Sequence, residues 1–219
     1  MLANLAEVVE NQEQMVDKGI LPHLKYILKS PNTLVKREAT RCMANLSAEY
    51  KYTAEIESQG ALPPLVECLA SPDVMTQRFA AMGIGNLASN PENQEKVLRE
   101  GGLEGLAKLA TLGNHDVESQ RYAVFALCNV SSNPSNHEAL LSKNIVPLFV
   151  LLLGSDDIDV RNAAILGISN FSCISANHSA IMENHALEPL IKLMLEDDVE
   201  TQLRYVMTAG KRRVDMHMN

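Results

Sequence analysis

The sequence contains no tryptophan and few other aromatic residues, with only five Tyr and four Phe in 219 residues. Hydrophobic residues still make up 46% of the chain, so its core must consist mainly of aliphatic side chains and Ala. This composition disfavours a β-sandwich, which depends on aromatic and β-branched residues. It favours a helical protein built from small repeated layers.

Basic residues are also in deficit, because 19 Lys and Arg stand against 27 Asp and Glu, for a net charge of −8. That balance disfavours a general nucleic-acid binder or membrane-surface binder. The longest apolar run, "IVPLFVLLLG", is about half of the ~20 residues needed to cross a bilayer. The start of the chain lacks the basic and apolar regions of a secretory signal. We therefore expect a cytoplasmic location, with the nucleus as an additional one.

Patterns that carry catalytic or metal-binding chemistry are absent as well. The cysteines are scattered without CxxC spacing and are interpreted as small buried hydrophobes in a reducing compartment: Cys42, Cys68, Cys128 and Cys173. No GxxxxGK, GxSxG or HExxH motif occurs. In "NHSAIMENH", His178, Glu183 and His185 span a helix start and the following turn, which disfavours a metal site. We predict no cofactor, no metal and no enzymatic activity.

The feature that the chain has in abundance is internal repetition. An Asn followed by an apolar residue recurs at intervals of 41, 41, 43 and 41 residues, at Asn4, Asn45, Asn86, Asn129 and Asn170. An apolar column keeps the same register at Leu24, Leu65, Leu106, Phe149 and Leu190. A column of small residues stands at Ala39, Ala80, Ala123 and Ala164, with Tyr205 in the last place. The two extra residues fall in "TLGNHD", where a loop can absorb them.

Each unit is predicted to contain three helices. The first is short, as in "NQEQMVDKG", where Asn can cap its start and Gly or Asn can end it in the left-handed conformation. The second opens near a Pro, as in "LPPLVECLAS". The third is the longest, and its Ala and Gly positions allow close packing of neighbouring helices. No unit can bury its apolar face alone, so the units are expected to stack into a solenoid.

The period, the second helix "GALPPLVECLAS" and the "GNLAS" ending of the third helix resemble armadillo repeats of the β-catenin-like and importin-α-like type. The resemblance covers essentially the whole chain. It implies an all-α, right-handed superhelical solenoid of three-helix repeats, forming one domain over residues 1–210. Its parts are a partial repeat at 1–10, repeats at about 11–50, 51–91, 92–134 and 135–175, a degenerate last repeat at 176–210 and an irregular tail at 211–219.

The repeated Asn is the first candidate for a binding residue, because stacking would place one copy per repeat along a single groove. In the resembled family the third helices line the concave surface, and this Asn pairs with the main chain of an extended peptide. A carboxamide suits that role since it offers one acceptor and two donors. The predicted peptide-binding rungs are Asn45, Asn86, Asn129 and Asn170. The alternative is structural, with Asn satisfying carbonyls of a helix or a neighbouring turn.

Two further rows share this face, because steps of four residues drift little around a helix. Eight residues before the Asn stand Arg37, Arg78 and Arg121, and four residues before it stand Arg41, Met82 and Phe125. The arginines would attract carboxylates of a ligand, with intramolecular salt bridges as the alternative. Met82 and Phe125 would add apolar contacts, with core packing as the alternative. Importin-α-like proteins carry Trp in the second row, and this chain has none.

We therefore predict a non-enzymatic interaction module that binds an extended protein or peptide segment, acidic with interspersed apolar residues. The alternative is a structural scaffold or homo-oligomer that assembles through its ends, where apolar columns lack a covering repeat. The residues concerned are Leu2, Leu5, Val8, Leu187, Leu190, Leu193 and Val199. The tail from Gly210, in which Lys211 stands where the pattern has Asn, is expected to be poorly ordered in a monomer. Neither nucleic-acid binding nor membrane insertion is expected.

Overall fold

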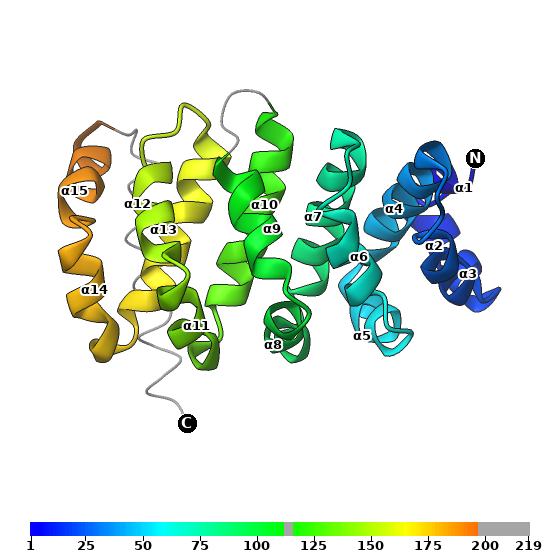
Figure 1. Cartoon of the computed structure of the whole chain (residues 1–219), viewed down its shortest axis with the longest axis horizontal. Helices are drawn as coiled ribbons and strands as arrows, with labels where there is room; N and C mark the ends of the chain where they lie inside the picture. The colour runs from blue at the N-terminus through cyan, green and yellow to red at the C-terminus, as the bar shows by residue number, and fades with distance from the viewer. Residues whose placement is uncertain (112–115, 197–219) are drawn as a thin grey trace.

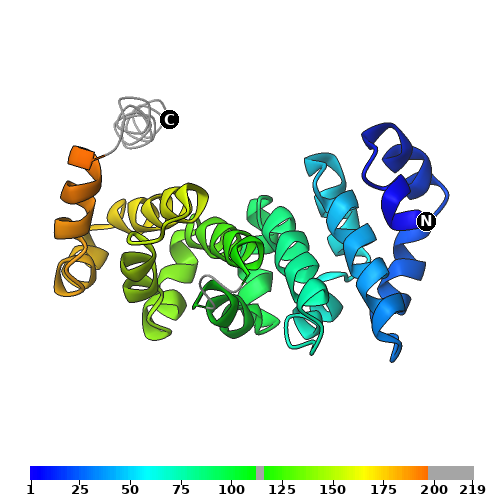
Figure 2. The same cartoon turned by 90° about the horizontal axis from the view of Figure 1, so that it is seen from above.

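The computed structural model describes residues 1–111 and 116–196. All regular structure within these two ranges is helical. Figure 1 shows the helices in a row from α1 near the N-terminus to α15, and Figure 2 shows the same layers from above. The predicted all-α solenoid is thus confirmed. No helix in the described ranges is long and apolar enough to cross a bilayer. Val199, Tyr205, Lys211 and the tail from Gly210 lie outside them.

Four complete three-helix units follow the single-turn helix α1 (Leu2–Leu5). The first helices of these units are α2 (Val9–Asp17), α5 (Tyr50–Ser58), α8 (Pro91–Arg99) and α11 (His137–Ser142). The second helices are α3 (Ile20–Ile27), α6 (Leu62–Cys68), α9 (Gly102–Thr111) and α12 (Ile145–Leu152). The third helices are α4 (Thr33–Ser47), α7 (Val74–Leu87), α10 (Val117–Ser131) and α13 (Ile158–Ser172). A fifth unit begins with α14 (His178–Glu183) and α15 (Leu187–Glu196), and short 3-10 helices, η2 (Pro134–Asn136) and η3 (Ser175–Asn177), precede α11 and α14.

The turn between the first and second helix of every unit passes through a left-handed residue. The φ angles are 74°, 71° and 80° at Gly19, Gly60 and Gly101, and 58° and 55° at Asn144 and His185. Only Gly adopts this conformation without steric cost, and Asn tolerates it better than most residues. The predicted left-handed ending of the first helix is therefore confirmed, and it extends to His185.

The polar pair at the start of most first helices ties each unit to the third helix before it. Asn93 Nδ2 donates to the carbonyl of Leu87 at 3.1 Å, and Gln94 Nε2 donates to that of Ala88 at 3.1 Å. The last carbonyls of a helix have no donor within that helix. These side-chain amides, which belong to the next unit, donate to them instead. The same contact is made by Asn11, Gln12, Asn136, His137, Asn177 and His178.

The core is one continuous cluster of aliphatic and small residues to which all three helices of each complete unit contribute. Ala80, Ala123 and Ala164 are fully buried, as their register predicts. A Cβ atom added at Gly167 would lie 2.4 Å from the ring of Phe149, so this helix approaches its neighbour at a distance that only Gly allows. Close packing of this kind explains why third helices carry small residues on their buried side.

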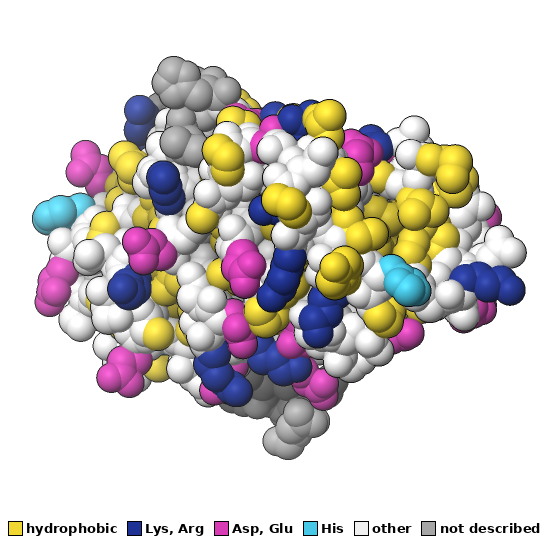
Figure 3. Space-filling view, turned by 45° about the vertical axis from the view of Figure 1, so that its right-hand side comes forward, with side chains coloured by type: hydrophobic (Ala, Val, Ile, Leu, Met, Phe, Trp, Pro, Cys, Tyr) yellow, Lys and Arg dark blue, Asp and Glu magenta, His cyan; other side chains and the backbone are white. Residues whose placement is uncertain are grey.

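The N-terminal end exposes apolar side chains. Leu2, Leu5 and Val8 are exposed, as predicted, and Leu34 and Val35 of α4 extend the exposed set. Figure 3 shows hydrophobic side chains gathered on this end of the molecule. Monomeric proteins rarely carry large contiguous apolar patches without a function for them.

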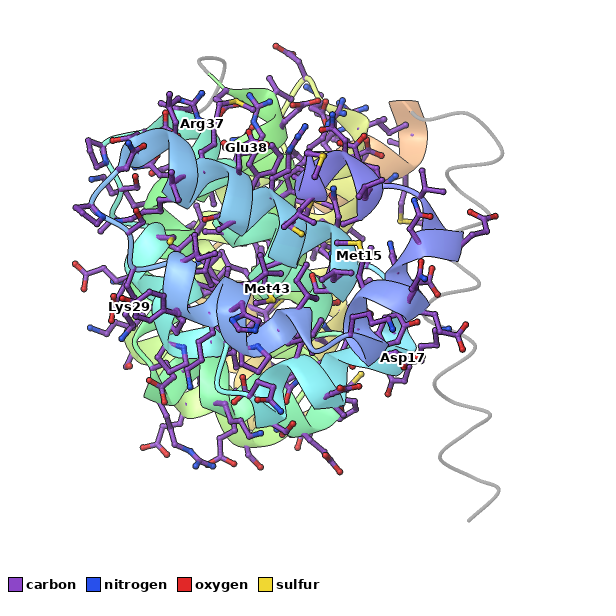
Figure 4. All side chains as sticks on the ribbon, turned by 90° about the vertical axis from the view of Figure 1, so that its right-hand side faces the viewer. Met15, Asp17, Lys29, Arg37, Glu38 and Met43 are labelled. Atoms are coloured by element: carbon purple, nitrogen blue, oxygen red, sulfur yellow. The ribbon has the colours of Figure 1, made fainter. Side chains whose placement is uncertain are left out.

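Figure 4 views the same end along the solenoid, with Arg37 and Glu38 at one edge and Met43 enclosed among the helices. At the other end of the described chain, Leu187 is exposed, whereas Leu190 and Leu193 are partly buried against the core.

Candidate functional site

The predicted binding residues all lie on the four third helices, which pack side by side in the order α4, α7, α10 and α13 (Figures 1 and 2). We call the surface that carries the repeated Asn and the two rows before it the groove face. The Asn ladder consists of Asn45, Asn86, Asn129 and Asn170. The structure thus brings the sequence-predicted residues together on one surface.

Each Asn of the ladder hydrogen bonds to the helix stacked before its own, which is α1 for Asn45 and the preceding third helix for the others. The Nδ2 atoms of Asn45, Asn86, Asn129 and Asn170 donate to the carbonyls of Ala3, Ala44, Gly85 and Cys128, at 3.1, 3.2, 2.9 and 3.0 Å. Each acceptor is the residue just before the previous Asn, in the last turn of its helix, where carbonyls lack intrahelical donors. The ladder therefore joins successive repeats and turns its Oδ1 atoms away from this contact.

The Arg row is paired within the chain. Arg37 binds Asp73 with Nε at 2.9 Å and with Nη2. Arg121 binds Asp157 with Nε at 3.0 Å and with Nη2 at 2.5 Å. Bidentate pairs of this kind are strong and directional. The intramolecular salt bridges named as the alternative role of the Arg row are therefore present.

Arg78 links two carboxylates of the next unit, with Nη2 2.6 Å from Asp116 and Nη1 on Glu118. Arg41 reaches Glu7 at 3.3 Å and Glu38 at 2.8 Å.

The aspartates of these pairs also cap the next third helix. The side chains of Asp73, Asp116 and Asp157 accept backbone N–H groups at the starts of α7, α10 and α13. A carboxylate at a helix N-terminus is favoured by the helix dipole. Each Arg therefore joins its own helix to the start of the following one.

The electrostatics of these pairs follow from the contacts. The Arg37 guanidinium beside Asp73 holds the pKa of that carboxyl well below its usual range. Arg121 lowers the pKa of Asp157 in the same way. Burial raises the pKa of Asp116, but hydrogen bonds from Ser119 and Arg78 outweigh it and the pKa is lowered. All three carboxyls are charged at neutral pH.

The groove face is hollowed between α10 and α13 by a pocket of about 520 Å³. Phe125 is 40% exposed there, and Tyr122 and Leu166 add further apolar wall. A Cβ atom at Gly85 would lie 2.8 Å from Phe125 Cδ1, so the absence of a side chain at this position makes room for the ring. The carboxylates of Glu118 and Asp159 lie at the rim.

The pocket contains Asn86, Asn129, Arg121 and Phe125 from the predicted set. Met82, by contrast, is half-buried and is not among its lining residues. Sequence reasoning missed the rim carboxylates and Tyr122. It also missed the aspartates that pair with the Arg row, although one signal for them was available, because an Asp follows each Arg of the row by 36 or 38 residues. Within the described ranges, no group of three His, Cys, Asp or Glu side chains is placed to hold a metal.

Comparison with known families and structures agrees with this architecture. The Armadillo/beta-catenin-like repeat family model matches residues 9–48 and 53–89. A comparison with curated proteins found no match. An engineered protein of known structure is 30% identical, with a TM-score of 0.85 over 95% of this chain and 86% of the other.

Two designed proteins are also similar. A designed armadillo repeat protein in complex with the peptide (KR)4 is 26% identical, with a TM-score of 0.85 over 96% of this chain and 89% of the other. A structure of computationally designed armadillo repeat proteins for modular peptide recognition is 25% identical, with a TM-score of 0.87 over 96% of this chain and 89% of the other. The repeat spacing, the three-helix units and these matches show that the chain belongs to the armadillo-repeat family.

Proposed function

We propose that the groove face is a non-enzymatic binding site for an extended segment of a partner protein. The observation that carries this proposal is the pocket at Phe125, where an exposed aromatic ring lies between two rungs of the Asn ladder. A concave site with apolar walls and a few polar groups is typical of ligand recognition. The designed relative that holds the peptide (KR)4 supports the peptide class of ligand.

The length of the segment follows from helix packing. Neighbouring helices lie about 8–10 Å apart, so the four third helices span roughly 24–30 Å. An extended chain advances about 3.3 Å per residue, so about eight residues cross the groove face. Alternate side chains of such a segment point toward the protein, and one of them can enter the Phe125 pocket.

The charge of the segment is the finer part of the proposal. The Arg row alone predicts an acidic segment with interspersed apolar residues. In the structure, however, four arginines pair with seven carboxylates, so this network carries a net charge of −3: Arg37, Arg41, Arg78 and Arg121 with Glu7, Glu38, Asp73, Asp116, Glu118, Asp157 and Asp159. Complementary potentials favour a ligand of opposite sign. We therefore propose that a basic segment with interspersed apolar residues binds more tightly than an acidic one.

Two matched octapeptides test this, one with the order Lys-Leu-Lys-Ser repeated twice and one with Glu in place of every Lys. Binding is measured by isothermal titration calorimetry for the wild type, for Phe125→Ala and for the control Tyr26→Ala, which removes an aromatic ring that is 83% exposed on α3. We expect the Lys peptide to bind the wild type and the control, and Phe125→Ala to weaken binding about tenfold or more. Tighter binding of the Glu peptide would favour an acidic segment as the ligand. Equal loss of affinity in Phe125→Ala and Tyr26→Ala would show that the pocket is not the binding site.

A second candidate function, self-assembly through the ends, is supported by the exposed apolar surface at the N-terminal end. Leu2, Leu24, Ile27, Leu34 and Val35 line a hollow of about 500 Å³ there. Association of copies would bury this surface. Sedimentation equilibrium over a wide concentration range tests it, because a mass equal to one chain at every concentration rules it out.

A further inference from the structure

The pocket between the neighbouring helices α10 and α13 (Figures 1 and 2) has a charged end and an apolar end. The charged end lies near the starts of the two helices and is lined by Glu118, Arg121 and Asp159. The apolar end lies further along them and is lined by Phe125 and Leu166. A side chain that fills the pocket therefore contacts an apolar wall and reaches toward charged groups at one end.

The groups at the charged end are already paired within the protein. Glu118 accepts from Arg78 Nη1, and Asp159 lies 3.5 Å from Arg121 Nε. Arg121 also holds Asp157 in its bidentate pair. A cationic head group inside the pocket would compete with these arginines and lie beside a charge of the same sign. The pocket therefore favours an uncharged side chain, while basic residues of a bound segment lie outside it, next to the exposed carboxylates of Glu118 and Asp159.

The repeat register indicates which kind of side chain the pocket lacks. At one position of the third helices, α7 carries Phe79, α10 carries Tyr122 and α13 carries Ala163, at the same intervals as the Asn ladder. The helix α13 thus has a methyl group where the two helices before it have an aromatic ring. Ala163 lines the pocket, so open space lies directly beside this methyl group.

Phe125 presents a positioned aromatic ring to this space. A Cβ atom added at Gly85 would lie 2.8 Å from Cδ1 and 3.3 Å from Cε1 of Phe125, so this edge of the ring packs against the backbone of α7. The rest of the side chain is exposed and lines the pocket. Two aromatic rings attract each other beyond the gain from burial alone, so a ligand ring would gain a contact here that an aliphatic side chain lacks.

We infer that the Phe125 pocket is specific for an aromatic side chain, which lies among Phe125, Ala163 and Leu166 when bound. The segment that crosses the groove face is then a basic one with an aromatic anchor. This inference rests on the proposed function for the identity of the ligand, but the specificity of the pocket can be measured without a peptide.

The test without a peptide uses two small probes, indole for an aromatic side chain and n-butylguanidinium for an arginine side chain. Each probe is titrated to millimolar concentration into the 15N-labelled protein and followed by 1H–15N NMR. The variant Ala163→Tyr gives α13 the ring that α10 carries at this register position. The matched control is Ala54→Tyr, because Ala54 is exposed in the middle of α5.

We expect indole to give saturable shifts at the backbone amides of Phe125 and Ala163 in the wild type. The shifts at Phe125 should persist in Ala54→Tyr and disappear in Ala163→Tyr, because the new ring fills the pocket. The absence of saturable shifts with indole, or tighter binding of n-butylguanidinium through the ring face of Phe125, would overturn the inference. Both of these outcomes are read from the wild type, so they decide the question even if Ala163→Tyr does not fold.

The peptide test starts from the octapeptide with the order Lys-Leu-Lys-Ser repeated twice. Both Leu residues are replaced by Phe in one peptide and by cyclohexylalanine, a saturated ring of similar shape, in another. We expect calorimetry to show the Phe peptide binding the wild type about two- to tenfold more tightly than either of the others. This preference should disappear in Ala163→Tyr and persist in Ala54→Tyr.

Equal or tighter binding of the cyclohexylalanine peptide would show that the pocket selects apolar volume rather than an aromatic ring, and would overturn the inference. If indole binds at Phe125 but no octapeptide binds, the proposed function fails and the aromatic specificity of the pocket stands.

Discussion

At the scale of single residues, the Asn ladder has a structural role before any ligand binds. Among the residues that the structure describes, Asn129 is the only side-chain donor to the carbonyl of Gly85, whereas the carbonyl of Ala44 receives both Asn86 and Ser47. A role confined to the ligand would leave stability unchanged on substitution. The cross-repeat bonds predict a different result.

We expect Asn129→Ala to lower the free energy of unfolding by about 0.5–1.5 kcal/mol. Asn86→Ala should cost less, because Ser47 still serves the carbonyl of Ala44. Urea denaturation of both variants beside the wild type measures the difference. Wild-type stability in Asn129→Ala would show that this bond contributes nothing in solution.

The Arg–Asp pairs predict a pH dependence. The pKa of Asp73 is lowered in the folded protein, chiefly by its hydrogen bonds from Arg37, and is about 3.9 in an unfolded chain. Its contribution to stability is therefore complete above about pH 4 and is lost as the pH falls through the folded-state pKa. Asp73→Asn removes the charge but keeps an acceptor that can cap α7.

We expect Asp73→Asn to be less stable than the wild type at pH 7, with the difference shrinking below about pH 4. Urea denaturation at a series of pH values measures this. A constant difference down to pH 2 would mean that ionisation of Asp73 does not contribute.

At the scale of helices, the sequence was most informative at positions where local sterics restrict the residue type. Gly19, Gly60 and Gly101 indicated left-handed turns, and the Ala column indicated close helix packing. Both follow from local steric rules that need no partner. The carboxylate partners of Arg37, Arg78 and Arg121 could not be found in this way, because an ion pair depends on how far one repeat rotates over the next.

The packing of third helices predicts strong sensitivity at the small columns. Ala80→Leu would insert three heavy atoms into a fully buried contact and should cost roughly 1–3 kcal/mol by overpacking. Ala54→Leu is the control, because Ala54 is exposed in the middle of α5. Thermal unfolding followed by circular dichroism compares the two variants. Equal tolerance at both positions would contradict the packing described for α7.

At the scale of the whole molecule, the groove face and the N-terminal end compete as explanations of function. The groove face has polar groups in regular order and a pocket, whereas the end is apolar and lacks such order. The sequence predicted both surfaces, since each follows from the repeat register. The charge prediction from the sequence was incomplete, because it counted the arginines of the row without the carboxylates that pair with them.

The groove network carries more carboxylates than arginines, so binding of a basic segment should weaken with added salt. Most of these charges are partly exposed, and such interactions are screened over about 8 Å at physiological ionic strength. We expect the dissociation constant of the Lys peptide to rise several-fold between 50 mM and 500 mM NaCl. Fluorescence anisotropy at these concentrations measures it. Affinity that is independent of salt would place the binding energy in apolar contacts alone.

The central claim is that the surface of α4, α7, α10 and α13 receives an extended segment. The most direct measurement is a two-dimensional 1H–15N NMR titration of the labelled protein with the Lys octapeptide. We predict saturable shifts in the side-chain amides of Asn86 and Asn129 and in the backbone around Phe125, with none at Leu34 or Val35. Shifts confined to the N-terminal end, or an unchanged spectrum with both octapeptides at millimolar concentration, would contradict the account.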